Sequence, residues 1–422
     1  MYKKTKLTNG LRIITVPAKN TKTAAVLLIV GVGSKYEIRE INGLSHFLEH
    51  MFFKGTKKRP NTLKLIEPLD KIGGIYNAFT GQEMTGYWAK VDAKNLDLAL
   101  DWVSDIYLNS KIAQEEINRE RGTILQELNM CLDNPSRYVE DLWTELLYRD
   151  QPAGWRIIGT EKMIKETNRS QFTKYLKEHY SSKNTVIAVA GHINHSSVIN
   201  KVKKYFELIN SQTVEDKLPV IEKQNNPQSL IYYKKTDQTH INLGVRAYNT
   251  FHPDKYALGL LGVILGGNMS SRLFISVRER QGLAYHISTG AETDTDTGFL
   301  CTHAGVDNQK IEKAIKTILQ EYKKISQRKI SQTELKKAKD YIKGTSLISM
   351  ESSDAQASFY ALQELLTDKI LTLEQKFAKI DAVTVNDIQR VAKDIFKPEK
   401  LNLALIGPFK DKERFNRIIS IL

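Results

Sequence analysis

The sequence predicts two similar α+β domains, each built on a mostly antiparallel sheet with helices packed on one face. Three observations lead to this prediction: strand and helix patterns that alternate, a helical pattern that recurs half a chain later, and a polar stretch between the halves. The chain has 422 residues, of which 41% are hydrophobic and 26% are charged. It is therefore long enough for two globular domains, and its composition excludes a disordered chain.

Short apolar runs and helix-period stripes alternate along the first half of the chain. We expect strands at 11–16, 24–30, 74–80, 85–91 and 185–190, and helices at 44–53, 62–72, 96–108, 114–130 and 198–208. A short connection joins the third and fourth of these strands, which favours antiparallel pairing between them.

A helical stripe in the first half recurs in the second half. The apolar positions of 96–107 have the same spacing as those of 311–322, and each pair lies 215 positions apart. Both stripes follow a Val-Asp dipeptide, which makes a chance match between two amphipathic helices less plausible than a duplication. We therefore expect an N-terminal domain at 1–210, a polar linker with two prolines at 211–227, and a homologous C-terminal domain at 228–422.

Charge and composition limit the other classes. The net charge is +14, but the lysines are spread along the chain, which favours a solvated basic surface over a nucleic-acid footprint. The sequence contains no run of about 18 apolar residues, so it does not predict a membrane-spanning helix. The N-terminal residues lack an apolar signal segment and the two cysteines form no CxxC pair, so we expect a cytoplasmic protein.

The segment 43–51 has the pattern of a metal site. His46 and His50 are four residues apart, so on a helix their imidazoles lie one turn apart on one face and can bind the same metal ion. Glu49 lies beside them and can accept a proton from metal-bound water, as in the inverted H-x-x-E-H motif. The opposite side of this helix would be apolar, with Leu44, Phe47, Leu48 and Met51. An amphipathic helix with two surface histidines is the alternative interpretation.

A catalytic zinc ion needs a third protein ligand. The expected helix at 114–130 offers Glu120 and Glu127, which are seven residues apart and therefore lie on one face. Two acids on a helix more often form a solvated surface, so the pattern alone does not select either one. Imidazole and carboxylate ligands also suit manganese or cobalt, so the metal stays open at this point.

The order and spacing of these motifs resemble the pitrilysin or insulinase family of zinc peptidases, in particular its half-length bacterial branch similar to mitochondrial processing peptidase. The resemblance covers nearly the whole chain: it includes 7–11, 43–51, 53–56, Glu120-Arg121, Glu127, Asp133 with Pro135, and 159–160. It implies a processing-peptidase-like metallohydrolase fold for both domains.

The resemblance also implies roles for the motif residues. His46, His50 and Glu127 would bind one zinc ion per chain, and Glu49 would be the catalytic general base that activates zinc-bound water. Glu120 matches the family's further catalytic acid, which orients the metal site without binding the ion. The activity implied is that of a zinc-dependent endopeptidase, an inverzincin, that hydrolyses short unfolded peptides in a closed chamber.

Two further groups would bind substrate by the same resemblance. Asn77, Ala78 and Phe79 match an edge strand to which a peptide adds as another strand, although an ordinary buried hairpin is the alternative. Arg278 and Tyr285, in the domain without the metal motif, match a pair that grips the substrate backbone and donates to the developing oxyanion. Arg280 is a rival for Arg278, but the seven-residue spacing to the tyrosine favours Arg278.

The resemblance also suggests partners. Some relatives join four such domains, whereas this sequence supplies two, so a second subunit is expected to close the chamber. Because the metal motif and the Arg–Tyr pair occur in one chain, we expect a clamshell homodimer, with a heterodimer as the alternative. Peptides are the expected ligands, and neither nucleic acid nor a membrane is an expected partner. There are three competing interpretations. The chain could be a non-catalytic or partner-dependent subunit of a larger peptidase or structural assembly, a hydrolase of small non-peptide molecules, or a basic nucleic-acid binder.

Overall fold

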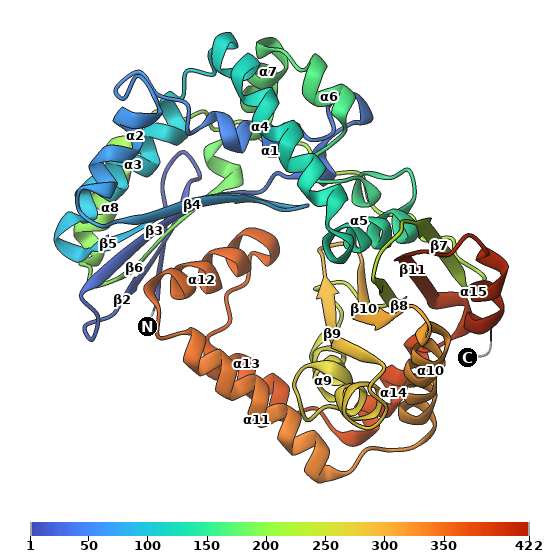
Figure 1. Cartoon of the computed structure of the whole chain (residues 1–422). Helices are drawn as coiled ribbons and strands as arrows, with labels where there is room; N and C mark the ends of the chain where they lie inside the picture. Colours follow the sequence, from blue (N-terminus) through green and yellow to red (C-terminus); the bar gives the residue numbers. More distant parts are fainter. Residues whose placement is uncertain (1, 421–422) are drawn as a thin grey trace. The chain divides into compact units, whose positions relative to one another are not determined.

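The computed structural model describes residues 2–420, which form two β-sheets with helices around them (Figure 1). The chain divides into two compact units, each made of three segments. Unit 1 comprises Met1–Leu128, Arg156–Leu218 and Leu347–Leu371; unit 2 comprises Asn129–Trp155, Pro219–Ser346 and Thr372–Leu422. Among the described residues, no helix is both long enough and apolar enough to span a membrane.

The sheet of unit 1 has six strands in the order β1-β2-β6-β3-β5-β4. Their bounds are β1 Lys3–Lys6, β2 Arg12–Pro17, β3 Thr23–Val30, β4 Ile75–Thr80, β5 Thr85–Asp92 and β6 Thr185–Gly191. All neighbours pair antiparallel except β2 and β6, which are parallel. The five strands expected from the sequence are therefore confirmed, as is the antiparallel pairing of β4 with β5, while β1 was not expected.

The sheet of unit 2 has five strands in the order β7-β11-β8-β10-β9. Their bounds are β7 Gln228–Tyr233, β8 Gln238–Arg246, β9 Ala284–Thr293, β10 Gly298–Asp307 and β11 Leu401–Gly407. This order matches β2-β6-β3-β5-β4 strand for strand, and the parallel pair again comes first. β3 and β8 begin 215 positions apart, at Thr23 and Gln238, so the fold confirms two similar domains.

Fifteen α-helices are described. They are α1 Leu44–Met51, α2 Thr62–Asp70, α3 Leu96–Asn109, α4 Gln114–Asp133, α5 Pro135–Tyr148, α6 Glu161–Glu166, α7 Arg169–His179, α8 His195–Phe206, α9 Lys255–Gly266, α10 Ile311–Gln327, α11 Gln332–Ser349, α12 Ser353–Thr367, α13 Leu373–Asp381, α14 Val385–Ile395 and α15 Lys412–Ile419. The repeated stripe forms α3 and α10, and its apolar residues are buried in both.

Each unit takes one helix from the other half of the sequence. α12, late in the chain, packs on the first sheet, where Ala357, Tyr360 and Ala361 join a core cluster with Leu27 and Ile29. Figure 1 shows α12 on the face of this sheet opposite α3 and α8. In the same way α5 packs on β8 and β11 of the second sheet. Because both faces of β3 are covered, its sequence is a continuous apolar run and does not alternate between apolar and polar residues.

The two units therefore differ from the contiguous halves expected at 1–210 and 228–422. One of the crossings between them, Leu218 to Pro219, falls inside the expected linker at 211–227, which contains no helix or strand in the structure. The chain also passes from one unit to the other before and after α5, and before and after α12. An amphipathic stripe shows that a helix has a buried face but not which sheet covers it, so sequence periodicity could not reveal this exchange.

Candidate metal centre

Helix α1 is fixed by its apolar side and by its N-terminus. Leu44, Phe47, Leu48 and Met51 are buried, which leaves the other side to the two histidines. The Glu37 carboxylate accepts hydrogen bonds from the backbone N–H groups of Gly43 and Ser45, each at 2.7 Å. Burial raises the pKa of Glu37 to about 7. Gly43 has a φ of 104°, and a Cβ there would lie 2.7 Å from the Cα of Gly159, so the turn requires glycine.

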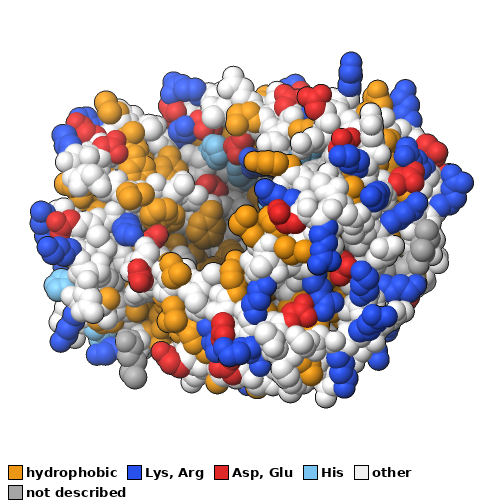
Figure 2. All heavy atoms as spheres, turned by 60° about the horizontal axis from the view of Figure 1, so that its bottom comes forward, with side chains coloured by type: hydrophobic (Ala, Val, Ile, Leu, Met, Phe, Trp, Pro, Cys, Tyr) orange, Lys and Arg blue, Asp and Glu red, His pale blue; other side chains and the backbone are white. Residues whose placement is uncertain are grey.

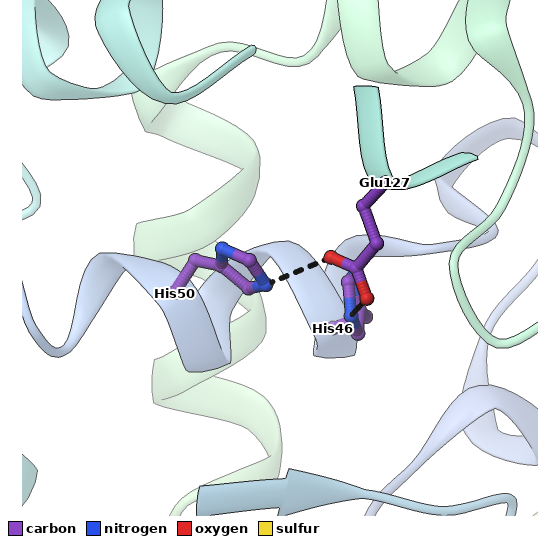
Figure 3. A group of neighbouring side chains, drawn as sticks. All are labelled: His46, His50 and Glu127. Atoms are coloured by element: carbon purple, nitrogen blue, oxygen red, sulfur yellow. Dashed lines mark ion pairs between the residues drawn. The ribbon is translucent and has the colours of Figure 1, made fainter. Parts of the chain in front are cut away.

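His46, His50 and Glu127 come together at one point in unit 1 (Figure 3). His46 Nε2 lies 3.6 Å from Glu127 Oε1, and His50 Nε2 lies 3.4 Å from Glu127 Oε2. Donor atoms bound to one tetrahedral zinc ion at about 2.0–2.1 Å are about 3.3–3.4 Å from one another. The three side chains therefore fit a zinc ion, and three protein ligands leave one position open, as in catalytic zinc sites.

The electrostatics of this group suit a cation. Hydrogen bonds from His46 and His50 hold the pKa of Glu127 far below its usual range, so this side chain is a carboxylate. Burial disfavours the charged form of His50, but its hydrogen bonds to Glu120 and Glu127 outweigh burial and raise the pKa of His50 to about 9. The negative charge around His50 thus favours a bound positive charge, which a divalent metal ion supplies in place of the proton.

Glu120 lies behind His50 rather than beside the ligand atoms of the three-residue group. Its Oε1 is 2.9 Å from His50 Nδ1, and its Oε2 is 2.5 Å from Lys54 Nζ. Burial disfavours the Glu120 carboxylate, but these hydrogen bonds outweigh burial and lower its pKa. Glu120 thus accepts the Nδ1–H proton of His50 and turns Nε2 toward Glu127. Lys54 was not expected in this role, because a single lysine in a basic chain gives no pattern.

Glu49 is held by Thr80, a second residue that the sequence does not point to. Thr80 Oγ1, at the end of β4, donates a hydrogen bond of 2.5 Å to Glu49 Oε2. Glu49 is on α1 between the two histidines, and β4 lies next to α1. The threonine therefore fixes one carboxylate oxygen, and the other oxygen stays available to accept a proton.

β4 is an edge strand of the first sheet. It contains Asn77, Ala78 and Phe79, of which Asn77 is exposed and the other two are half-buried. The backbone N–H of Ala78 donates to Asn77 Oδ1 at 2.9 Å, so a side chain of the strand itself covers this edge donor. Phe79 lies against Gly86 of β5, where a Cβ would come within 2.4 Å of its ring. β4 thus pairs with β5 as a hairpin, and its residues are exposed or half-buried rather than fully buried.

Arg278 and Tyr285 lie together in unit 2. The guanidinium carbon of Arg278 is 5.3 Å from the centre of the Tyr285 ring and 4.7 Å from that of Phe274. Arg278 is in a π-helical turn, Phe274–Glu279, and Tyr285 is in β9, which is the edge strand equivalent to β4. The Tyr285 side chain is 76% exposed. Arg278 and Tyr285 are thus in contact, and Arg280 is an exposed residue two positions further on.

The basic residues do not gather into one patch on the face drawn in Figure 2. Lys and Arg side chains there are interspersed with acidic, apolar and other polar groups. Many of the lysines also pair with a carboxylate one helical turn away, such as Lys165 with Glu161 and Lys336 with Asp340. This pattern is typical of a solvated charged surface.

Two family profiles match the chain. Residues 12–161 match the insulinase family, peptidase family M16, and residues 167–342 match the peptidase M16 inactive domain. A Bacillus subtilis protein named uncharacterized zinc protease YmxG is 34% identical over 409 residues, which cover 97% of this chain and 98% of the relative. The chain belongs to the insulinase family, peptidase family M16. A Streptomyces coelicolor relative of this M16 chain, named uncharacterized zinc protease SCO5738, is 30% identical over 97% of this chain and 90% of its own length.

Solved structures agree with this M16 assignment. A protease from Helicobacter pylori superposes with a TM-score of 0.91 at 26% identity, and the match covers 97% of this chain and all of the other. A chain of complex III2 from Candida albicans gives a TM-score of 0.85 over 99% of both chains, but at 19% identity it shows the fold alone. The same holds for the peptidase M16 inactive domain from Pseudomonas fluorescens, at 17% identity and a TM-score of 0.89.

Proposed function

We propose that this M16 chain is a zinc-dependent endopeptidase that hydrolyses short unfolded peptides. The observation that supports this most directly is the convergence of His46, His50 and Glu127 next to Glu49, on a helix that adjoins the edge strand β4. When bound by these three residues, zinc would polarise the scissile carbonyl and make water a better nucleophile. Family members named zinc proteases support this choice of metal. One ion per chain is part of the proposal.

Glu49 is the proposed general base. Its carboxylate would accept a proton from the attacking water and then deliver it to the amine of the leaving peptide. Thr80 would hold the carboxylate in place through the hydrogen bond to Oε2. Glu120, with Lys54 behind it, would keep His50 oriented without touching substrate.

β4 is the proposed binding site for the peptide backbone. A peptide added along this edge would be recognised by main-chain hydrogen bonds, which do not depend on its sequence, so unfolded peptides are the substrate class that fits. Asn77 would have to release the N–H of Ala78 as the peptide pairs, while Phe79 would contact its side chains. In unit 2, Tyr285 would donate to the developing oxyanion and Arg278 would hold a substrate carbonyl.

Closure of a chamber by a second copy of the chain, as a homodimer, is part of the same proposal. The alternative is a subunit that lacks activity alone, and the match of 167–342 to a domain described as inactive is the observation that favours it. A heterodimer with an active partner would satisfy that alternative. The two proposals differ in whether the purified chain by itself cleaves peptides.

Cleavage of quenched fluorescent peptides of about 10–20 residues tests the proposal. The wild type should cleave them, lose activity on chelation and regain it with zinc. Glu49→Gln should keep the metal but lose the base, so its rate should fall by about 10²–10⁴-fold. Glu40→Gln, an exposed glutamate outside the site, is the matched control and should keep full activity. Absence of cleavage by metal-loaded wild type across varied peptides would exclude the homodimeric enzyme and favour the partner-dependent subunit.

A further inference from the structure

Three of the nine histidines of the chain gather on one face of the second sheet. His240, His286 and His303 lie on three neighbouring strands, β8, β9 and β10. His240 and His286 both stand opposite Gly305 of the middle strand, one on either side, and His303 precedes Gly305 by two residues. Residues two apart on a strand point to the same face, so the three imidazoles surround the space above Gly305.

The imidazole rings are close to the separation that one metal ion requires. The ring centres of His286 and His303 are 5.7 Å apart, and those of His240 and His303 are 6.2 Å apart. Two imidazoles bound to one tetrahedral zinc ion at about 2.0 Å have ring centres about 5.2 Å apart. Within the described residues only the His46 group already has its ligand atoms within 4.8 Å, so the three imidazoles of this cluster have to approach one another to bind one ion. His286 is exposed and can turn toward the other two rings.

The nitrogens of two rings are arranged for an additional partner. His303 Nδ1 lies 2.8 Å from Asn242 Oδ1, and a carbonyl oxygen only accepts, so the proton is on Nδ1 and the lone pair on Nε2. This is the outer hydrogen bond that typically orients a metal-binding histidine. Nε2 lies 3.3 Å from the hydroxyl of Ser136, and a metal ion at Nε2 would replace this hydrogen bond. His240 Nδ1 is buried and has no hydrogen-bond partner among the described residues, which is unfavourable unless something binds there.

Glycine at position 305 leaves the room for that partner. A Cβ at this position would lie 3.2 Å from Gln238 Oε1, 3.5 Å from His240 Cε1 and 3.7 Å from His240 Nδ1.

We propose that His240, His286 and His303 form a second metal site in unit 2, which binds a divalent transition-metal ion such as nickel, copper or zinc. Imidazole nitrogen is the donor that these ions prefer, whereas calcium and magnesium require oxygen donors. The second site has no carboxylate ligand and must close to bind, so its affinity should be lower than that of the first site. The first site instead has an ionised carboxylate and is already assembled.

The test uses the full chain with the first site removed by His46→Ala and His50→Ala. Calorimetric titration of this metal-stripped protein with Ni²⁺ at pH 7 should show one ion bound per chain. His286→Ala should weaken that binding by more than about 10-fold, the lower limit of what loss of an outer partner costs at metal sites. Gly305→Ala should also weaken it, because the added methyl group occupies the space between the rings while all three ligands remain. His192→Gln replaces an exposed histidine outside the cluster and should change nothing.

A separate measurement checks that the variants still fold. His286 is exposed, so His286→Ala should melt at the same temperature as its parent in the presence of a chelator. The proposal is overturned if the double variant binds no Ni²⁺. It is equally overturned if Ni²⁺ binds with the same affinity after His286→Ala and Gly305→Ala, because the ion is then held by histidines elsewhere. Neither result depends on peptidase activity.

Discussion

Thr80 donates a hydrogen bond of 2.5 Å to Glu49, and this contact joins the edge strand β4 to the metal-site helix α1. Asn77, Ala78 and Phe79 precede Thr80 on the same strand. A peptide that pairs with β4 would therefore be positioned by the same strand that positions the proposed general base. The positions of the substrate and of the base then depend on the same strand, so the reacting atoms would be held at a fixed distance from each other.

Replacement of Thr80 tests this coupling. A hydrogen bond to a charged group contributes about 1.5–3 kcal/mol, so Thr80→Val should lower kcat of peptide cleavage roughly 10- to 100-fold. Zinc content should stay unchanged, because the Thr80 hydroxyl donates to the proposed base and not to a proposed zinc ligand. Thr80→Ser keeps the hydroxyl and should keep most of the activity. Equal losses in Thr80→Val and Thr80→Ser would show that the methyl packing of this residue matters rather than its hydrogen bond.

Glu120 should control metal affinity rather than the chemical step. Its hydrogen bond to His50 Nδ1 orients the ligand, and loss of such an outer partner typically costs 10- to 100-fold in metal affinity. Glu120→Gln should therefore weaken zinc binding by this factor, measured by competition with a coloured chelator. At saturating zinc most of the peptidase activity should return. A variant that binds zinc as the wild type does but stays inactive would contradict the positioning role and imply a direct catalytic one.

Zinc should stabilise the folded chain through the first site. A ligand that binds only the folded state at about 100 times its Kd contributes about 2.7 kcal/mol, which corresponds to roughly 5–10 °C in the melting temperature of a unit this large. One equivalent of zinc should raise the melting temperature of the stripped wild type more than that of Glu127→Ala, which keeps only the weaker second site proposed above. Glu115→Ala replaces an exposed glutamate on the same helix and should respond like the wild type.

The two main features of the site differ in how far the sequence could predict them. His46, Glu49 and His50 lie within about one turn of a helix, so the helical periodicity was enough to predict that they share a face. For Glu127 the periodicity of α4 gave two candidates, and only the family resemblance selected one. Thr80 and Lys54 could not be predicted, because each is a single common residue whose role depends on a contact with a distant side chain. The strands and duplication were predictable because apolar patterns repeat.

The exchange of α5 and α12 between the units was beyond sequence reasoning, and it makes a prediction about packing. Ala357 and Ala361 are buried against Ala188 and Ala190 of the first sheet, so small residues allow α12 to approach it closely. Ala361→Leu should overpack this contact and destabilise the chain by about 1–3 kcal/mol in denaturant unfolding. Ala355→Leu, at a half-buried position of α12, should have a smaller effect. Equal effects would argue against this packing of α12.

His179 should make the chain less stable in acid. Burial lowers its pKa from 6.5 to about 4, although Glu215 opposes the shift. Between pH 6.5 and 4 the unfolded chain therefore binds a proton at this histidine that the folded chain does not bind. The free energy of unfolding should fall as the pH decreases through this window, by about 2 kcal/mol from this residue once its partial exposure is taken into account.

His179→Phe isolates this contribution. A phenyl ring can keep the contact with Tyr175, whose ring centre lies 4.4 Å from that of the imidazole, but it cannot bind a proton. Denaturant unfolding at pH 6.5 and pH 4.5 should show a smaller loss of stability for this variant than for the wild type. His192→Gln replaces an exposed histidine and should lose as much stability as the wild type does. If His179→Phe and the wild type lose stability equally, burial of His179 is not a source of the acid sensitivity.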